Sequence, residues 1–196
     1  MAAETVLVDG IEKKIVRIIP YRGIKLKKGA SGSSIAKADD IHRQIHFENS
    51  AGGIAYLITL SQPGGHDMPW NAGETSKKKA SGRLSQPDKL LIFNELHNDA
   101  ACRGHGQSSI NVFVLDCNDL SKAERLTLET HLARYTKKRN SKAFNTQKTG
   151  AEYAFVPEPN IAILGVTAGP LKCSATHGTK AEKELGKQFM RALGIK

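Results

Sequence analysis

The sequence predicts a mixed α/β (α+β) fold in which antiparallel strands pair with one another and helices flank them. Three observations lead to this class. Short apolar runs rich in β-branched residues alternate with segments whose apolar residues recur at the three- and four-residue spacing of a helix. Turns that contain glycine or proline separate neighbouring strand runs, as in hairpins. A chain of 196 residues can bury one core with extensions, so we do not expect two equal domains.

Residues 1–51 are predicted to form an N-terminal extension. The runs Thr5 to Val8 and Lys14 to Ile19 are β-prone and lie on either side of an Asp9-Gly10 turn, which indicates a hairpin. Residues 20–34 combine glycines with cations and few apolar residues, so we expect a mobile basic loop there. From Ile35 to Ile45 the apolar residues return at helical spacing, which predicts an amphipathic helix.

Three further strands are predicted in the middle of the chain. Gly53 to Leu60 is rich enough in β-branched and large apolar residues for a central strand. The glycines and proline of residues 62–65 turn the chain back into a short return strand, about Trp70 to Gly73. Ser109 to Asp116 alternates between apolar and polar residues and is predicted to be a third strand.

Two helices are predicted around that third strand. A basic run from Ser76 to Arg83 leads into a helix over Lys89 to His97, which starts after Pro87. Its expected buried positions are Leu90, Leu91, Phe93 and Leu96. Ser121 to Glu124 has the pattern of a capping box, which opens the second helix.

Glu129 lies in this second helix, on the same face as Leu126, Leu132 and Ala133. A carboxylate at that position lies either at the core boundary or in a cleft, or else on a solvated helix face beside the apolar stripe. Within a cleft it would need a cationic or metal partner, because burying an unpaired charge is costly. The spacing alone leaves both interpretations open.

The charge of the chain favours a polyanionic partner. There are 29 lysines and arginines against 19 acidic residues, a net charge of +10. The cations cluster at residues 22–28, 77–79 and 137–142, and solvated basic faces are the alternative interpretation. Three cysteines without metal-type spacing and scattered histidines argue against a zinc site. Because no secretory signal or long apolar window is visible, we expect a cytoplasmic protein.

Five features between residues 52 and 145 carry a family resemblance. They are Gly53-Ile54, Gly73-Glu74-Thr75, Arg83, Glu129 within a Leu-Glu-x-x-Leu step, and Asn145. Their order along the chain resembles the GIY-YIG nuclease family. The resemblance implies a three-stranded antiparallel sheet flanked by helices. It also implies a Mg²⁺-type ion held by the helix glutamate, an arginine on the scissile phosphate and motif tyrosines around the attacking water.

The chain departs from the family at the two motif tyrosines. Ala55 ends the first motif, and Tyr56 follows one residue later, which places it on the other sheet face unless a bulge near Gly53 shifts it. The second motif reads Asn71-Ala72-Gly73. The candidates for orienting the water are Tyr56 first, then Lys77 or another lysine of residues 77–79, with His66 and His97 as further candidates.

These features together predict a divalent-metal-dependent endonuclease that hydrolyses DNA, with a type II restriction enzyme as the more specific hypothesis. Glu129 would hold Mg²⁺ or Mn²⁺, and Arg83 would offset the charge on the phosphate. The expected nucleic-acid contacts are Lys77, Lys78, Lys79, Arg83, Lys137, Lys138, Arg139 and Asn145. The alternative is a catalytically inactive nucleic-acid-binding module that keeps the fold, and RNA as substrate and a homodimer stay open.

Residues 146–196 are predicted to form a C-terminal extension packed on the core of residues 52–145. Tyr153 to Val156 and Ile161 to Val166 are β-prone and indicate a second hairpin. Thr179 to Glu182 is another capping-box pattern and opens a basic helix. The apolar stripe of that helix favours packing on the core over the alternatives, which are a DNA clamp or a dimer contact.

Overall fold

The structure, a computed structural model, describes residues 3–28, 34–49, 53–62, 66–102, 109–144 and 158–196. Its strands are β1 (Thr5–Val8), β2 (Ile11–Ile24), β3 (Lys27–Lys28), β4 (Ser34–Ile35), β5 (Ile54–Gln62), β6 (His66–Thr75), β7 (Ile110–Asp116) and β8 (Ile161–Ile163). Its helices are α1 (Ala38–Gln44), α2 (Ala80–Leu84), α3 (Pro87–Cys102), α4 (Lys122–Arg139) and α5 (Lys180–Leu193). None of these described helices is both long and apolar enough to cross a membrane.

The main sheet has six strands and is mostly antiparallel. Its order is β1-β2-β7-β5-β6, and β8 pairs with β2 in the parallel sense. The expected mixed α/β class is therefore confirmed, but the sheet is wider than three strands, because β1, β2 and β8 from the two ends of the chain join β7, β5 and β6. Among the described residues β6 forms one edge of the sheet, and this edge positions the site described below.

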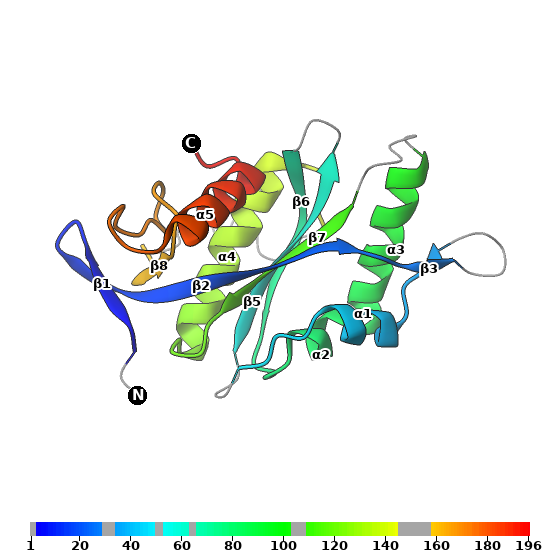
Figure 1. The fold of residues 1–196 in the computed structure, drawn as a ribbon, viewed down its shortest axis with the longest axis horizontal. Helices are drawn as coiled ribbons and strands as arrows, with labels where there is room; N and C mark the ends of the chain where they lie inside the picture. Colours follow the sequence, from blue (N-terminus) through cyan, green and yellow to red (C-terminus); the bar gives the residue numbers. More distant parts are fainter. Residues whose placement is uncertain (1–2, 29–33, 50–52, 63–65, 103–108, 145–157) are drawn as a thin grey trace.

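Helices cover both faces of the sheet (Figure 1). Successive residues of β5 point to opposite faces, as in any strand. Ala55 and Leu57 contribute to the core cluster shared with α4 and α5. Ile54, Tyr56 and Ile58 contribute to the cluster shared with α1, α2 and α3. Tyr56 therefore lies on the α2 and α3 side of the sheet.

The predicted N-terminal hairpin is confirmed, but its second strand is longer than expected. Asp9 and Gly10 both have positive φ, 52° and 79°, which suits the tight turn between β1 and β2. Strand β2 continues to Ile24, and β3 and β4 pair with each other, so the loop predicted for residues 20–34 is wrong for residues 20–24, 27–28 and 34. Residues 29–33 lie outside the described part of the chain. Helix α1 starts at Ala38, because Ser34–Ile35 pairs with β3 as strand β4.

The predicted central strands and the helix after Pro87 are confirmed as β5, β6, β7 and α3. Strand β6 begins at His66 and is longer than the predicted return strand, whereas the turn before it lies at residues 63–65, outside the described residues. Within the basic run only Ala80–Leu84 is helical. The expected burial of Leu91 is wrong: it is 58% exposed, and Ile92 is buried in its place.

Both predicted capping boxes are confirmed, at the start of α4 and of α5. The interpretation of α5 as a core-packing helix is also confirmed, since Phe189 and Leu193 are buried against the sheet. Strand β8 confirms the β-prone run from Ile161, although it pairs with β2. The other arm of the predicted second hairpin, residues 153–156, lies outside the described residues.

Candidate active site

A tyrosine and a glycine face each other across the two strands at the sheet edge. Tyr56 on β5 is the register partner of Gly73 on β6. A Cβ atom on Gly73 would lie 2.2 Å from the Tyr56 hydroxyl oxygen, so only glycine leaves room for the phenol at this position. No bulge near Gly53 is needed to place Tyr56 on the α2 and α3 side, because the β5–β6 register is regular from Ile54 to Ile58.

The Tyr56 hydroxyl is a buried polar atom of the kind that a ligand can satisfy. The side chain is 1% exposed, and the hydroxyl makes no hydrogen bond to any described residue. An unmade hydrogen bond at a buried hydroxyl costs free energy. Burial raises the pKa of Tyr56 far above its ordinary value, although Arg83 opposes the shift. The phenol therefore stays protonated at neutral pH and is a hydrogen-bond donor.

Arg83, on the short helix α2, lies in the same region, and an ion pair holds its guanidinium in place. Its two terminal nitrogens donate to the two carboxylate oxygens of Asp88 at 2.9 and 3.0 Å, and Nη1 also donates to Gln86. Burial by itself lowers the pKa of Arg83, but Asp88, Tyr56 and Glu129 together hold the pKa above its ordinary value. Arg83 is 21% exposed and Asp88 is 55% exposed, so an incoming anion would meet the carboxylate as a competitor.

Lys89, one residue after Asp88 at the start of α3, is a buried cation in the site. It is 7% exposed and donates to the Asn71 side-chain carbonyl at 3.1 Å. Its Nζ lies 5.7 Å from the centre of the Tyr56 ring, a distance at which cation and ring attract. The pKa of Lys89 is lowered, chiefly because burial disfavours the charged ammonium and also because Arg83 is close.

Glu129 is the fourth residue of the candidate site, and it comes from a helix on the opposite face of the sheet. Helix α4 covers the face opposite to α2 and α3, but it packs closely on the edge strand β6. The partly buried carboxylate of Glu129 acts electrostatically on Tyr56, on Arg83 and on Lys89. The structure thus brings Tyr56, Arg83 and Glu129, which are far apart in the sequence, to one region at the β6 edge.

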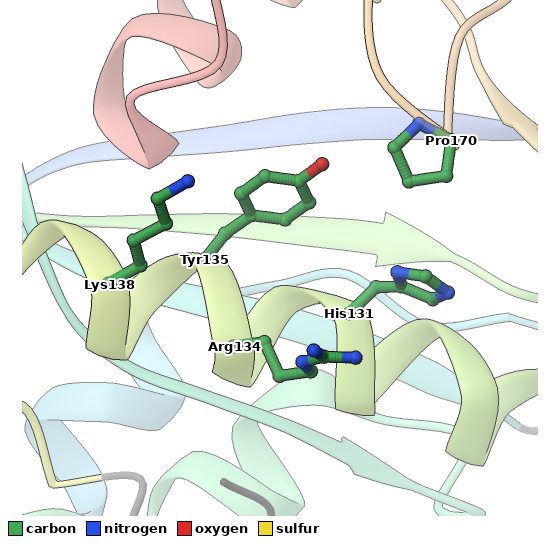
Figure 2. Close-up of a pocket in the computed structure, with 5 residues that line it drawn as sticks. All are labelled: His131, Arg134, Tyr135, Lys138 and Pro170. Atoms are coloured by element: carbon green, nitrogen blue, oxygen red, sulfur yellow. The ribbon is translucent and has the colours of Figure 1, made fainter. Parts of the chain in front are cut away.

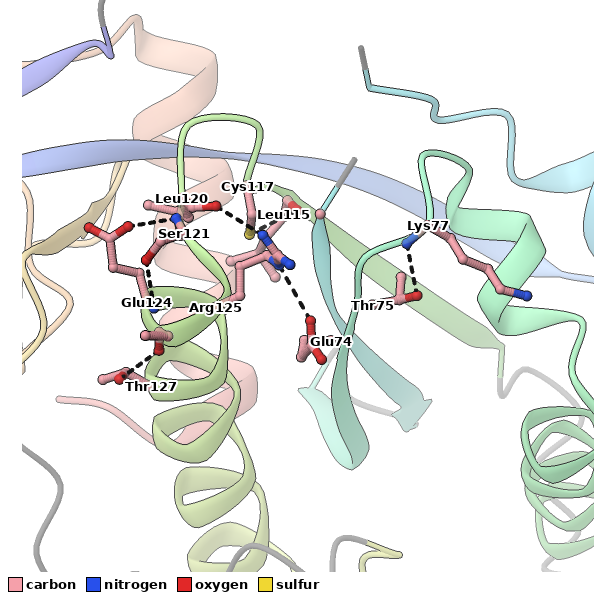
Figure 3. Close-up of polar contacts among 12 residues, drawn as sticks. Glu74, Thr75, Lys77, Leu115, Cys117, Leu120, Ser121, Glu124, Arg125 and Thr127 are labelled. Atoms are coloured by element: carbon pink, nitrogen blue, oxygen red, sulfur yellow. Dashed lines mark hydrogen bonds and ion pairs between the residues drawn. The ribbon is translucent and has the colours of Figure 1, made fainter. Parts of the chain in front are cut away.

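Arg125, one turn before Glu129 in α4, fixes that helix against the edge strand (Figure 3). Its Nε pairs with the Glu74 carboxylate of β6 at 3.4 Å, and its Nη1 donates to the Leu120 carbonyl at 2.9 Å. The guanidinium passes over Gly53, where a Cβ would lie 2.9 Å from Arg125 Cδ and where φ is +102°. Gly53 is therefore required by close packing and by its backbone conformation.

The capping box at the start of α4 holds the same end of the helix. Ser121 Oγ accepts from the Glu124 amide at 3.2 Å, and the Glu124 carboxylate accepts from the Ser121 amide at 2.6 Å (Figure 3). Lys14 of β2 also pairs with the Glu124 carboxylate at 2.9 Å. Glu124 therefore anchors the start of α4 to β2.

Glu129 is the candidate oxygen ligand for a metal ion in the site. No group of three His, Cys, Asp or Glu side chains gathers within the ranges that the structure describes. Two other nearby carboxylates pair with arginines: Glu74 pairs with Arg125, and Asp88 pairs with Arg83. Mg²⁺ commonly takes one or two carboxylates together with waters and substrate phosphates. Glu129 fits that type of site, since its carboxylate is partly buried and close enough to Arg83 and Tyr56 to act on both electrostatically.

The lysines of the basic run lie beside the site and not in its centre. Lys77 donates to the Gly82 carbonyl at 2.9 Å, and Figure 3 shows its side chain directed away from Arg125 and Glu74. Lys78 is exposed, and Lys79 pairs with Glu48 at 3.4 Å. These lysines form an exposed basic surface next to α2.

The other predicted site residues lie elsewhere. His97, eight residues beyond Lys89 in α3, lines a separate cavity with Ile24 and Leu60. Lys137 donates to the Ala143 carbonyl at 3.3 Å near the end of α4. Lys138 lines a cavity on the outer flank of α4, and Arg139 packs beside Gly194 at the end of α5. Asn145 and the side chain of His66 lie outside what the structure describes.

Sequence reasoning missed Lys89, Asp88 and Asn71. Lys89 and Asp88 were read only as the first turn of a helix, where charged residues are common. A signal was present: both follow Arg83 within six residues, on the helix that comes next in the chain. Asn71 stands where the second family motif has tyrosine, and in the structure it accepts a hydrogen bond from Lys89.

Comparison of the chain with protein-family models, with curated proteins and with solved structures found no match. The chemistry of the site therefore has to be inferred from its own residues.

Proposed function

We propose that this protein is a divalent-metal-dependent endonuclease of the GIY-YIG type, which hydrolyses DNA phosphodiester bonds at the β6 edge. The observation that carries the proposal is the convergence of a phenol, a guanidinium, a buried amine and a carboxylate from four elements. Phosphodiester hydrolysis needs these groups: a cation for the phosphate, a carboxylate for a metal, and polar groups that place the water.

Each side chain has a distinct role in the proposed reaction. Arg83 exchanges the Asp88 carboxylate for a nonbridging phosphate oxygen and offsets the charge that builds there. The Tyr56 hydroxyl, which stays protonated, donates to the attacking water or to the phosphate and orients it. Glu129 would hold Mg²⁺ or Mn²⁺, which as a Lewis acid would polarise the phosphate and stabilise the leaving 3′ oxygen.

Lys89 is the proposed proton acceptor. Its pKa is lowered mainly by burial, so a larger share of the amine is neutral than in an exposed lysine. The water oxygen forms a bond to phosphorus, its proton passes to Lys89, and the bond from phosphorus to the 3′ oxygen breaks. The 3′ oxygen then takes a proton from solvent. The products are a 5′-phosphate and a 3′-hydroxyl.

The second candidate function is a nucleic-acid-binding module without catalysis. The specific observation in its favour is the bidentate ion pair between Arg83 and Asp88, in which both terminal nitrogens of Arg83 already donate to the carboxylate. Ala55 and Asn71, which stand where the family motifs have tyrosine, also favour a module without catalysis. In that function Arg83 would have a structural role, and the exposed lysines 77–79 would supply the contacts to phosphate.

A plasmid-cleavage assay tests the proposal. Supercoiled DNA is incubated with wild-type protein in Mg²⁺, in Mn²⁺ or in EDTA, and with Glu129→Ala, Arg83→Ala and Lys89→Met. We expect metal-dependent cutting by the wild type, strong loss in the first two variants, and for Lys89→Met a rate that no longer rises with pH. Full cutting by Glu129→Ala and Arg83→Ala would remove the site assignment. DNA binding without cutting by the wild type would favour the binding module.

A further inference from the structure

A second cavity, of about 410 Å³, lies against α4 and is separate from the candidate active site (Figure 2). It is lined by His131, Arg134, Tyr135, Lys138 and Pro170. The four α4 residues recur at three- and four-residue spacing, so they form one stripe of the helix. Glu129 precedes His131 by two residues and is therefore rotated about 200° around the helix axis from it. The two sites occupy different flanks of α4.

Four of the five described lining side chains can donate a hydrogen bond. Arg134 and Lys138 are both exposed cations and lie one helical turn apart, an arrangement that is unfavourable without a compensating anion. Burial raises the pKa of Tyr135 despite the opposing effect of Arg134, so its hydroxyl remains a donor. Figure 2 shows that hydroxyl directed toward the side of Pro170. None of the described lining residues is acidic.

An independent observation adds positive charge behind the cavity. Lys13 of β2 is 3% exposed, and its ammonium donates to the carbonyl of Pro170, a residue of the cavity wall, at 3.1 Å. Within the described part of the chain no carboxylate pairs with Lys13. A buried ammonium whose partner is a neutral carbonyl leaves an uncompensated charge, which an anion on the far side of Pro170 would balance.

We propose that this cavity is a phosphate-binding site distinct from the Arg83–Glu129 site. An arginine fork, a lysine, a histidine and a phenol suit the oxygens of a phosphate mono- or diester. The volume exceeds that of a bare ion and falls in the range of small-molecule pockets. The phosphate comes either from a free compound such as a nucleotide or from a nucleic-acid backbone. The proposal does not depend on hydrolysis and goes beyond the proposed function.

The test is calorimetric titration of the wild type with inorganic phosphate, AMP and adenosine. The variant is Arg134→Gln/Lys138→Gln, and the control is Lys122→Gln/Lys187→Gln, which removes the same charge from exposed positions outside the cavity. All three proteins are also measured with Arg83→Ala. We expect phosphate and AMP to bind, adenosine not to bind, and the affinity to fall at least about tenfold in the variant alone, since each charged hydrogen bond lost is substantial.

The outcomes separate clearly. Binding that persists with Arg83→Ala supports a second site, and binding that disappears with Arg83→Ala overturns it. Equal losses in variant and control would show only a general effect of charge and would overturn the proposal, as would the absence of phosphate and AMP binding by the wild type. Repeating the titration with a short DNA duplex identifies the source. A loss that extends to the duplex assigns a backbone phosphate, and a loss confined to phosphate and AMP assigns a free compound.

Discussion

Helix α4 carries two sites of opposite character on its two flanks. The edge site at Glu129 mixes acids with cations: Asp88 and Glu129 lie near Arg83 and Lys89, and the buried phenol of Tyr56 lies near Lys89. The cavity at His131 has two cations and no acidic residue among its described lining residues. A mixed site suits a metal ion and the transfer of a proton, whereas a basic site suits the binding of an anion. If chemistry belongs to the edge site, substitutions there should change cleavage most, and a change in the support of α4 should affect mainly stability.

The largest effect is expected for Glu129→Gln. The substitution removes the carboxylate charge and keeps the size of the side chain, so Mg²⁺-dependent cleavage should fall at least about 100-fold while the fold and the affinity for DNA are kept. The measurement is the cleavage rate together with DNA binding in Ca²⁺. Glu95→Gln, at an exposed position of α3, is the matched control and should cleave normally. If Glu129→Gln cleaves at the wild-type rate, the edge site is not catalytic.

A large structural effect is expected for Gly73→Ala. The new methyl group would lie 2.2 Å from the Tyr56 hydroxyl, so the buried phenol must move. We expect a loss of about 1–3 kcal/mol in the free energy of unfolding, as for other overpacked cores, and a loss of cleavage. Gly82→Ala is the matched control, because its nearest neighbour would be at 3.6 Å. Equal denaturation midpoints for wild type and Gly73→Ala would contradict the close approach of Tyr56 to Gly73.

A smaller effect, in the opposite direction, is expected for Asp88→Asn. Asp88 holds both terminal nitrogens of Arg83, and its removal frees the guanidinium for phosphate. DNA affinity, measured by fluorescence anisotropy in Ca²⁺, should rise a few-fold, because one carboxylate near a phosphate site is lost. Weaker DNA binding by Asp88→Asn would show that the Asp88 carboxylate positions Arg83 and does not compete with the phosphate.

The smallest effect is expected for Glu124→Gln, which tests the shared scaffold of both sites. Burial alone raises the pKa of Glu124, but hydrogen bonds from Lys14 and Ser121 hold it below its ordinary value. A lowered carboxylate pKa contributes stability above the unfolded-state pKa, and that stability is lost as the pH falls through the folded-state pKa. We therefore expect Glu124→Gln to lose about 1 kcal/mol at pH 7 and to converge with the wild type in strong acid. If the difference in free energy of unfolding between the two proteins does not change with pH, the ionised Glu124 carboxylate does not stabilise the start of α4.

The elements that the sequence predicted well are those whose signal is local. The two capping boxes, the apolar run of β5 and the proline before α3 each specify structure within a few residues. The length of β2 could not be predicted this way. Pro20 and Gly23 indicate a loop, but pairing with β7 continues past both. At Pro20 the described pairing is on one side of β2 only, and a proline is tolerated there.

The candidate site was predictable in part, because some of its residues lie in segments with a local sequence signal. The order of segments along the chain was enough to select Tyr56, Arg83 and Glu129, because the strand, the basic run and the capped helix that hold them can be recognised from the sequence. Lys89 was not selected, since a lysine in the first turn of a helix normally extends into solvent. Lys89 is instead buried and donates to Asn71 of strand β6, and such a contact is specified by tertiary packing and not by spacing.

Strand β2 gives the fold a particular order of assembly. Its first half pairs with β1 and, through Lys14 to Val16, with β8 near the end of the chain, while its second half pairs with β7. During synthesis on the ribosome the N-terminal hairpin can close early, but β2 cannot acquire its parallel neighbour until residue 163 has left the exit tunnel. Such distant pairings slow folding and leave an open strand exposed on the nascent chain, which makes that interval the one in which a chaperone would be most useful.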